Sequence, residues 1–578
     1  MTPAQQKIDL YYNIARRLFY TCLIGLFVTA LVFAVYYFTT GYETLTKWFL
    51  SFNDCFYRNT FWTRDFFTPE AKTKGNYFAA AASVVCIAGL VYAGINWKRF
   101  FLRKSEPLPI PKLSLPWSVA VAVLGLVTWY LGQSLVKPSS DEIFSAVNCS
   151  ELPHFQVLAY YMLPNNHIYF NFINGFVMRW THTDAVVTGR IISMVAYIGV
   201  LFCIFHWLSG LFKSRLWAFV AIVPAALQFT PWAFGFQSRG YECQLLCAWG
   251  AFLTLYSYVN TGNARIMKLN ALFSIMGFAF VPTFLYFFLT QLATLVFVQV
   301  YNRKLTWRVW KYQSIILAGV FLLYLPALCF SGVNALTAND YVKSPHLPFA
   351  KYFNNWVEVT KYFINFIFSF VIRENHPLNF ILFFTPLLLL ILPGKHQKQT
   401  GVFYLLLWVV WACVCFYMQR NPFSRNMIFH YSLTFAFVLY TIHSIVELVL
   451  TRIKSLQLKV ALKTAIFAAP LLLFSVHLAK WGKENVPFSL YFMDVNVMYN
   501  DYASDIKTFP PGCSIACSNE RYCFYYYCRT GPYRTSRCPT GNEDYFINVG
   551  GEQVPDVVSK NYVLERHGIG GFEIYKHK

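Results

Sequence analysis

The chain has 578 residues, of which 57% are hydrophobic and only 13% are charged, and its mean hydropathy is +0.42. A soluble domain carries about 25% charged residues, so this composition excludes an ordinary soluble protein. Lys and Arg outnumber Asp and Glu by 48 to 26, which gives a formal net charge of +22. Because the basic residues gather in short loops between apolar runs, they indicate cytoplasmic loops of a membrane protein, and no nucleic-acid partner is expected.

Apolar runs long enough to cross a bilayer recur along the whole chain, for example residues 18–38 and 315–330. Only helices and closed barrels satisfy their backbone hydrogen bonds inside lipid, and runs of this length without strict alternation predict helices. The first run is longer than the core of a signal peptide, and no small-residue cleavage pattern follows it. We therefore interpret it as a retained signal anchor.

The basic clusters set the predicted topology. Positively charged loops stay in the cytoplasm, so an even number of spans must separate successive clusters. This parity predicts that residues 269–301 form a hairpin of two short helices that turns near Pro282. The count then reaches about 13 spans, with the amino terminus in the cytoplasm and the carboxyl terminus outside. The predicted external segments are 40–76, 136–186, 235–243, 334–376, 420–426 and 479–578.

The first large external loop contains an adjacent pair of acids, Asp141 and Glu142, in a chain where acids are scarce. Neighbouring side chains diverge by about 100° on a helix and point to opposite faces in an extended loop. The two acids are therefore expected to divide the work, one facing a reacting group and the other holding the loop or a cation. The competing interpretation is an amino-terminal helix cap that interacts with the helix dipole, which Ser140 before Asp141 fits.

Further polar groups lie at the predicted outer rim of the membrane. Ionisable residues at such positions are candidates for a functional site, and arginine offers a permanent, forked positive charge that suits phosphate. Each has a structural alternative: a snorkelling anchor for the arginines, loop hydrogen bonding for the histidine, and packing for the tyrosine. The candidates are Asn165, Asn166, His167, Arg239, Tyr241 and Arg425.

The last hundred residues are polar and carry five cysteines, at positions 513, 517, 523, 528 and 538. Cysteines this dense in an external segment favour disulfides. Zinc is the alternative, but the spacing fits a zinc motif only in part and no histidine pair follows. Residues 544–556 and 561–578 alternate like short strands, which predicts a small α/β or α+β domain.

Four motifs resemble the GT-C glycosyltransferases, in the branch that contains the protein O-mannosyltransferases and the lipid A aminoarabinose transferase. They are SSDEIFSAV (139–147), SRGYECQLLCAWGAFLTLY (238–256), FSRNMIFHYSLTFAFVLY (423–440) and NYVLERHGIGGFEIYKHK (561–578). The chain departs from the family pattern twice. Asn426 stands where the family usually has tyrosine, with no proline after it, and two additional spans precede the span that leads into the acidic loop.

The resemblance implies an all-α polytopic membrane protein with a small external domain at its end. Its parts are an added two-helix transmembrane hairpin over residues 1–114, a GT-C-like catalytic domain over 115–478 and a cysteine-rich periplasmic domain over 479–578. We expect the chain to cross a bacterial inner membrane many times, with the external side in the periplasm, and the endoplasmic reticulum is the alternative location.

The implied activity is inverting transfer of a sugar from a polyprenyl-phosphate donor to a hydroxyl of a lipid, glycan or protein at the external face. Asp141 would deprotonate or orient that hydroxyl, and Arg239 and Arg425 would receive the lipid phosphate. Glu142 would act beside Asp141 and bind a divalent cation (Mg, Mn, Ca or Zn). The implied substrate contacts are Asn165, Asn166, His167 and Tyr241.

A transporter or flippase of lipid-linked sugars or other solutes is the alternative function. Such a protein is expected to place ionisable residues in the middle of the membrane and to show internal repeats with broken helices. Here the charges gather at the outer rim and no repeat is visible in the sequence. The sequence therefore favours the enzyme.

Overall fold

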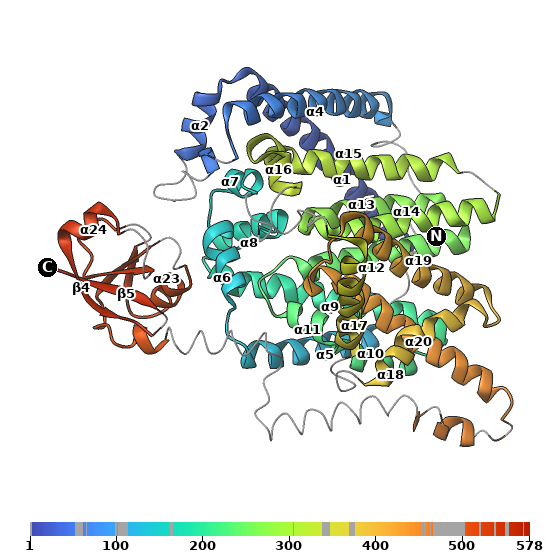
Figure 1. The fold of residues 1–578 in the computed structure, drawn as a ribbon. Helices are drawn as coiled ribbons and strands as arrows, with labels where there is room; N and C mark the ends of the chain where they lie inside the picture. The colour runs from blue at the N-terminus through green and yellow to red at the C-terminus, as the bar shows by residue number, and fades with distance from the viewer. Residues whose placement is uncertain are drawn as a thin grey trace.

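The computed structural model describes most of the membrane part and most of the carboxyl-terminal domain. The described residues are 3–51, 62–64, 66–98, 101, 114–161, 166–303, 306–337, 347–368, 376–453, 455, 457–462, 464–465, 503–518, 522–536, 539–549, 554–569 and 571–578. Two positions singled out above, Asn165 and Cys538, lie outside them. Figure 1 shows a large helical part and a small sheet domain beside it.

Seven helices of the described chain are long and apolar enough to cross a membrane. They are α4 (Pro69–Ile95), α5 (Leu115–Leu135), α9 (Ala185–Phe212), η4 with α14 (Pro282–Tyr301), α15 (Trp307–Phe330), α19 (Lys395–Met418) and η6 with α20 (Ser424–Leu450). An eighth span is formed if α10 (Arg215–Ala226) and α11 (Phe229–Gly235), bent by 77°, cross together. The polytopic helical class is confirmed, whereas the count of about 13 spans stays a prediction.

The predicted hairpin near Pro282 is present. Helix α13 (Met267–Phe280) ends at Val281, whose backbone is extended, and the 3-10 turn η4 (Pro282–Phe284) leads into α14 (Leu285–Tyr301). Proline suits the first position of a helix because its fixed φ is already helical and its missing N–H would have no partner there. The sequence therefore located this turn correctly.

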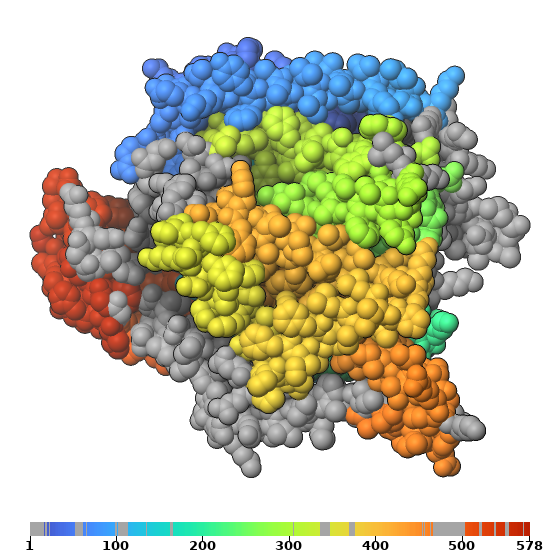
Figure 2. Space-filling view, turned by 45° about the vertical axis from the view of Figure 1, so that its right-hand side comes forward, coloured from blue at the N-terminus to red at the C-terminus, as the bar shows by residue number. Residues whose placement is uncertain are grey.

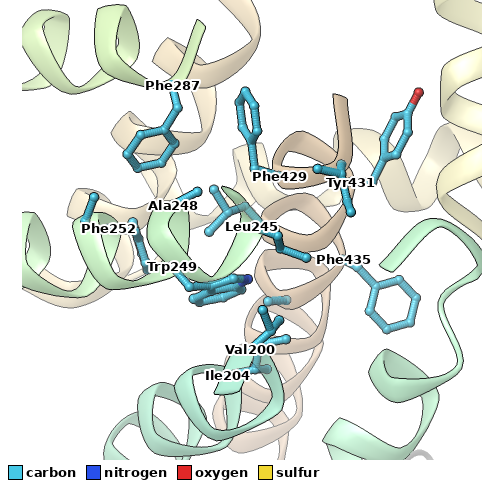
Figure 3. Packing of buried hydrophobic residues seen from close by; sticks show 14 of the residues in the cluster. Val200, Ile204, Leu245, Ala248, Trp249, Phe252, Phe287, Phe429, Tyr431 and Phe435 are labelled. Atoms are coloured by element: carbon cyan, nitrogen blue, oxygen red, sulfur yellow. The ribbon is translucent and has the colours of Figure 1, made fainter. Parts of the chain in front are cut away.

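The centre of the helical part is a hydrophobic cluster shared by α9, α12 (Tyr241–Thr261) and α20 (Ile428–Leu450). In Figure 3, the Trp249 side chain of α12 extends toward the α20 helix, with Val200 of α9 nearby in the view. Its indole Nε1 donates a hydrogen bond of 2.9 Å to Ser432 Oγ on α20. Helices within lipid associate through close packing and hydrogen bonds of this kind, so this cluster fixes the spacing of the two helices that begin at the site.

The amino-terminal helices form a hairpin along one side of the molecule. Helix α1 (Pro3–Thr39) packs along α4, and α4 packs against α15; Figure 2 shows these first elements, in blue, covering the green helices. Tyr37 donates a hydrogen bond of 2.7 Å to the carbonyl of Cys329 on α15. The hairpin expected over residues 1–114 is thus attached to the rest of the chain, while its exact limits stay a prediction.

Short elements complete the membrane part and its outer rim. They are α2 (Tyr42–Leu50), α6 (Ser140–Ser145), the π-helix η2 (Ala146–Ser150), α7 (His154–Ala159), α8 (Ile168–Thr181), η3 (Ala264–Ile266), α16 (Gly332–Thr337), α17 (Phe349–Phe368), α18 (Pro377–Phe384), η5 (Thr385–Leu390) and η6 (Ser424–Met427).

The carboxyl-terminal domain is a mixed sheet with the strand order β2-β1-β3-β5-β4. Strand β1 pairs in parallel with β2 and β3, whereas β5 pairs antiparallel with β3 and β4. Its elements are β1 (Ser514–Cys517), α23 (Tyr522–Arg529), β2 (Arg534–Ser536), β3 (Tyr545–Val549), α24 (Asp556–Asn561), β4 (Tyr562–His567) and β5 (Phe572–His577). Both segments that alternate in the sequence contain strands, so the predicted small α/β or α+β domain is confirmed.

The cysteines of this domain differ from expectation. Cys513, Cys517 and Cys528 are buried thiols within one hydrophobic cluster. A buried thiol behaves as a small apolar side chain, so these three contribute to the domain core without the expected disulfides. Among the described residues no group of three or more His, Cys, Asp and Glu side chains is arranged to hold a metal ion, so the zinc alternative has no support there either.

Candidate functional site

The acidic pair lies on α6, a helix of six residues whose start is fixed by a capping box. The N–H of Glu142 donates to Ser139 Oγ at 3.3 Å, and the N–H of Ser139 donates to Glu142 Oε2 at 2.9 Å. This reciprocal pair is the expected behaviour of a Ser-x-x-Glu sequence. The capping interpretation is therefore correct for Glu142, with Ser139 rather than Ser140 as the cap, and it does not account for Asp141.

Asp141 meets two arginines that are distant in the sequence. Its Oδ2 atom lies 3.1 Å from Arg239 Nη1 and 2.9 Å from Arg425 Nη1. Arg239 lies two residues before the start of α12, while Arg425 lies in η6 at the start of the α20 span. The side chain of Arg239 is only 1% exposed, whereas those of Asp141 and Arg425 are 31% and 30% exposed. The structure therefore joins three predicted residues in one cluster that solvent can reach.

Glu142 points the other way and is fully enclosed. Its Oε1 accepts from Arg190 Nε at 2.9 Å and from the N–H of Ser238 at 2.8 Å. Its Oε2 accepts from Arg190 Nη2 at 3.1 Å, in addition to the Ser139 N–H. The predicted divergence of the two neighbouring carboxylates is thus present, and Glu142 holds α6 to α9 and to the loop before α12.

These contacts do not fit a metal ion at Glu142. A carboxylate that accepts four hydrogen bonds, two of them from a guanidinium, has its lone pairs occupied and its charge compensated. A divalent cation there would have to displace Arg190, which is itself buried. We therefore derive no step that involves a cation at Glu142.

Arg190 is the main site residue that the sequence reasoning missed. It lies inside the apolar α9 helix, in a span with very few other charges. A lone arginine within a transmembrane run is costly unless it has a partner, and it marks a structural or functional site. This signal was present in the sequence and could have linked residue 190 to one of the scarce acids.

His167 packs against the Arg239 guanidinium and accepts a hydrogen bond from the neighbouring backbone. Its Nδ1 accepts a 2.9 Å hydrogen bond from the N–H of Gly240, and its Nε2 lies 3.4 Å from Arg239 Nη2. Because Nδ1 accepts, the neutral ring carries its proton on Nε2, so the approach of Arg239 is packing rather than a hydrogen bond. Burial, together with the charges of Arg239 and Arg425, lowers the pKa of His167 well below 6.5. The histidine is therefore neutral at physiological pH.

The backbone around Gly240 depends on the absence of a side chain. A Cβ atom at this position would lie 2.8 Å from His167 Nδ1, which is shorter than a van der Waals contact. Tyr241 follows and stacks edge-on against His167, with ring centroids 4.5 Å apart, while the Arg239 guanidinium lies 5.4 Å from the tyrosine ring centroid. Tyr241 thus belongs to the packing that orients Arg239.

Asn166 takes part in the loop scaffold. Its Nδ2 donates to the carbonyls of Val157 and Tyr160, at 3.3 Å and 2.6 Å, and its Oδ1 accepts from Asn171 Nδ2 at 2.9 Å. The amide is buried and engaged at both ends. These contacts favour a structural role for Asn166 over the predicted contact with substrate.

The net charge of the site is positive. Arg190 compensates Glu142, while Arg239 and Arg425 share the single carboxylate of Asp141. These five residues, three arginines and two carboxylates, carry a formal net charge of +1. Partly desolvated arginines in this arrangement bind oxyanions well, and phosphate in particular.

Side-chain contacts connect all six predicted external segments. Asp141 connects 136–186 with 235–243 and 420–426, and Arg529 joins the last segment at Glu151, 2.8 Å away. Gln156 Nε2 donates to the carbonyl of Phe49 at 2.8 Å, and Tyr352 Oη donates to Asn421 Oδ1 at 3.1 Å. Described residues of the six segments are therefore joined by contacts, while the side of the membrane on which the segments lie stays a prediction.

No family model and no curated protein matches the sequence. Among solved structures, the chain is similar to ArnT from Cupriavidus metallidurans, in the apo state and bound to undecaprenyl phosphate. Each comparison gives 9% identity and a TM-score of 0.42, covering 80% of this chain and 98% of that chain. The arabinosyltransferase EmbB from Mycobacterium smegmatis gives 12% identity and a TM-score of 0.41, covering 86% of this chain and 49% of that chain.

ArnT, an aminoarabinose transferase, and EmbB are both GT-C glycosyltransferases, the superfamily that the sequence motifs resemble. At this level of identity the likeness assigns no role to any residue. The chemistry of the site rests on the contacts described above.

Proposed function

We propose that this protein is a membrane glycosyltransferase that moves a sugar from a polyprenyl-phosphate donor to an acceptor hydroxyl at the external, periplasmic face. The observation that carries the proposal is the Asp141 carboxylate between Arg239 and Arg425, at 3.1 Å and 2.9 Å. A base for the acceptor and two cations for a phosphate leaving group are the groups that this transfer requires, and they lie within one cluster.

In the proposed reaction the acceptor oxygen attacks the anomeric carbon on the face opposite the phosphate. The new bond to the acceptor oxygen forms as the bond from the anomeric carbon to the phosphate oxygen breaks, so the configuration inverts. Asp141 receives the hydroxyl proton, and the lipid phosphate leaves with the electron pair. Arg239 and Arg425 stabilise that negative charge, which is the larger requirement because the phosphate is retained as an anion.

Donor binding would also change Asp141. With both arginines on its Oδ2 atom, the carboxylate is a weak base because nearby positive charge favours its ionised form. A phosphate that draws the guanidinium groups toward itself would remove part of that stabilisation. Asp141 would then accept a proton more readily once the donor is in place.

The remaining residues would act through position. Glu142 and Arg190 hold α6, and His167 and Tyr241 orient Arg239. The acceptor class (lipid, glycan or protein), the sugar, and any divalent cation beyond Glu142 stay predictions of the sequence.

Sugar transfer in proteoliposomes tests the proposal. Radiolabelled polyprenyl-phosphate sugars would be offered with an extract of cell-envelope acceptors to wild type, Asp141→Asn and the control Glu358→Gln. Glu358 is an exposed acid on α17 whose partner is Lys361. We expect wild type and the control to transfer label, and Asp141→Asn to lose about 10²–10⁴-fold, the range for a general base.

Two results would reject the enzyme. In one, wild type consumes no donor but moves lipid-linked sugar across the vesicle membrane, which would support the transporter. In the other, Asp141→Asn transfers label as fast as wild type, which would leave the acid without a catalytic role.

A further inference from the structure

The carboxyl-terminal domain contacts the acidic loop through one helix. In Figure 1, α23 lies on the side of the sheet domain that faces α6. Ile143, Ala146 and Val147 of the loop share a hydrophobic cluster with Phe524 and Tyr527 of α23. The domain is thus packed against the short helix that carries Asp141.

Polar contacts of α23 reach both ends of that loop. Tyr527 Oη donates a 3.0 Å hydrogen bond to the carbonyl of Pro138, the residue before the Ser139 cap. Arg529 Nη1 lies 2.8 Å from Glu151 Oε1, just after η2. The helix therefore bridges the loop from the residue before the α6 cap to the residue after η2.

The same helix also contacts the start of α9. Arg529 Nη2 lies 3.1 Å from Asp184 Oδ2, and Tyr526 Oη donates to Asp184 Oδ1 at 3.1 Å. Asp184 caps α9 by accepting from the N–H of Val186 at 2.8 Å, and α9 carries Arg190, the partner of Glu142. Helix α23 therefore contacts both the loop that contains α6 and the start of α9, whose Arg190 binds Glu142.

We propose that α23 is a positioning element for the reaction, with Tyr527 and Arg529 as its positioning residues. They hold α6 in the orientation that places Asp141 against Arg239 and Arg425, and they contact neither substrate nor the reacting atoms. This inference rests on the proposed function for its kinetic consequence, but its structural part does not depend on any activity.

The physical argument is the small size of α6. A helix of six residues is too short to be stable by itself, and Glu142 fixes only one face of it. Without α23, Asp141 would sample several orientations at the open side of the site. Misplacement of a reacting group by about 1 Å can cost on the order of 100-fold in rate.

Hydrogen–deuterium exchange of the full-length protein in nanodiscs gives the first test. Peptides covering 136–151 would be compared among wild type, Tyr527→Phe, Arg529→Ala and the control Lys576→Ala. Lys576 belongs to the same domain and its partner is Glu565, 3.9 Å away. We expect faster exchange in 136–151 for the first two variants only, with unchanged exchange in β3 and β5.

Kinetics gives the second test, in the assay of the proposed function. We expect kcat to fall on the order of 10–100-fold in Arg529→Ala and less in Tyr527→Phe, with KM for the donor nearly unchanged. Arg529→Lys should recover part of the loss because it keeps the charge near Glu151 and Asp184. The control Lys576→Ala should match wild type.

The outcomes separate the inference from the function. Unchanged exchange in 136–151 in Tyr527→Phe and Arg529→Ala would overturn the positioning role, whatever the activity. An altered KM for the acceptor with constant kcat would also overturn it and would make α23 an acceptor contact. If Arg529→Ala loses protection in β3 and β5 as well, Tyr527→Phe alone decides, because it removes only one hydroxyl. If exchange in 136–151 is faster in the two variants but wild type transfers no sugar, the positioning role of α23 stands and the glycosyltransferase is rejected.

Discussion

Two carboxylates one residue apart have opposite surroundings in this protein. Glu142 is enclosed, accepts four hydrogen bonds and has one arginine of its own, whereas Asp141 is about one-third exposed and shares its charge between two arginines. A balanced and buried ion pair has no capacity left for a ligand, while an unbalanced and accessible cluster attracts an anion. The contacts give Glu142 a structural role, whereas a chemical role for Asp141 is our proposal, and each prediction below changes one residue of this comparison or a residue beside it.

After the loss expected for Asp141→Asn, the next largest effect on sugar transfer comes from shifting the exposed carboxylate without removing it. Asp141→Glu keeps the charge but moves the oxygens by one methylene, so sugar transfer should fall on the order of 100-fold. Thermal unfolding in detergent should stay close to wild type, because the side chain is partly solvated. Transfer rate and melting temperature, measured on the same preparation, check both parts. A large drop in melting temperature with normal transfer would reverse the roles given to the two acids.

The buried pair should show the opposite pattern. Arg190→Met leaves Glu142 as an uncompensated buried charge, which costs about 3–5 kcal/mol, so the variant should fold poorly or melt early. The double variant Glu142→Gln/Arg190→Met should be more stable than Arg190→Met alone, since no charge is then stranded. Fluorescence-detected melting of the three proteins makes the comparison. Equal stability of the single and double variants would contradict a structural ion pair.

Substitution of the arginines in the exposed cluster should weaken binding of the donor phosphate, whereas substitution of Asp141 should slow the transfer step. Arg425→Lys keeps the charge but loses the forked geometry, so a polyprenyl phosphate without sugar should inhibit about tenfold less well, a loss of about 1.4 kcal/mol. Lys361→Arg on α17, whose exposed side chain contacts Glu358, is the matched control. Inhibition constants measured in detergent check the prediction. An unchanged constant would remove Arg425 from the phosphate site.

The smallest effect concerns His167, which lies beside Arg239. Its pKa is lowered in the folded protein, so below about pH 6.5 the unfolded chain binds a proton that the folded site resists. Stability should therefore decrease as the pH falls below 6.5, and this part of the decrease should be absent in His167→Asn, whose amide oxygen can still accept from Gly240. Melting temperatures between pH 7.5 and 5.5 measure the difference. Parallel curves for the two proteins would show that the histidine does not titrate in this way.

The sequence identified several residues of the cluster correctly, but it did not show which side chains contact one another. Arg239 and Arg425 were each candidates for a phosphate contact, and both meet Asp141. Asn166 and Glu142 were also candidates, yet their polar atoms are engaged within the protein. The residue type and its predicted position at the membrane rim can be read from the sequence alone. The direction in which a side chain points depends on the rotation of its helix, which neighbouring helices set through packing.

The carboxyl-terminal domain teaches the same lesson. Alternating residues predicted strands β3, β4 and β5 correctly, because a half-buried strand requires that pattern, but they did not indicate β1 or β2. The cysteines predicted disulfides, but Cys513, Cys517 and Cys528 instead fill the domain core as thiols. The contact of Tyr527 with Pro138 joins residues 389 positions apart, and no local pattern in either segment indicates it.

The sequence by itself determined the class of the protein, the turn at Pro282 and the presence of an acid and two arginines in segments that it predicts to be external. These follow from hydropathy, charge and proline geometry, which act over a few residues at a time. Only the tertiary structure decided that Asp141 meets Arg425 across 284 residues while Glu142 turns away to Arg190. That choice belongs to the packing of α6 between α9 and α23, because hydrogen bonds between separate helices exist only once those helices are in place.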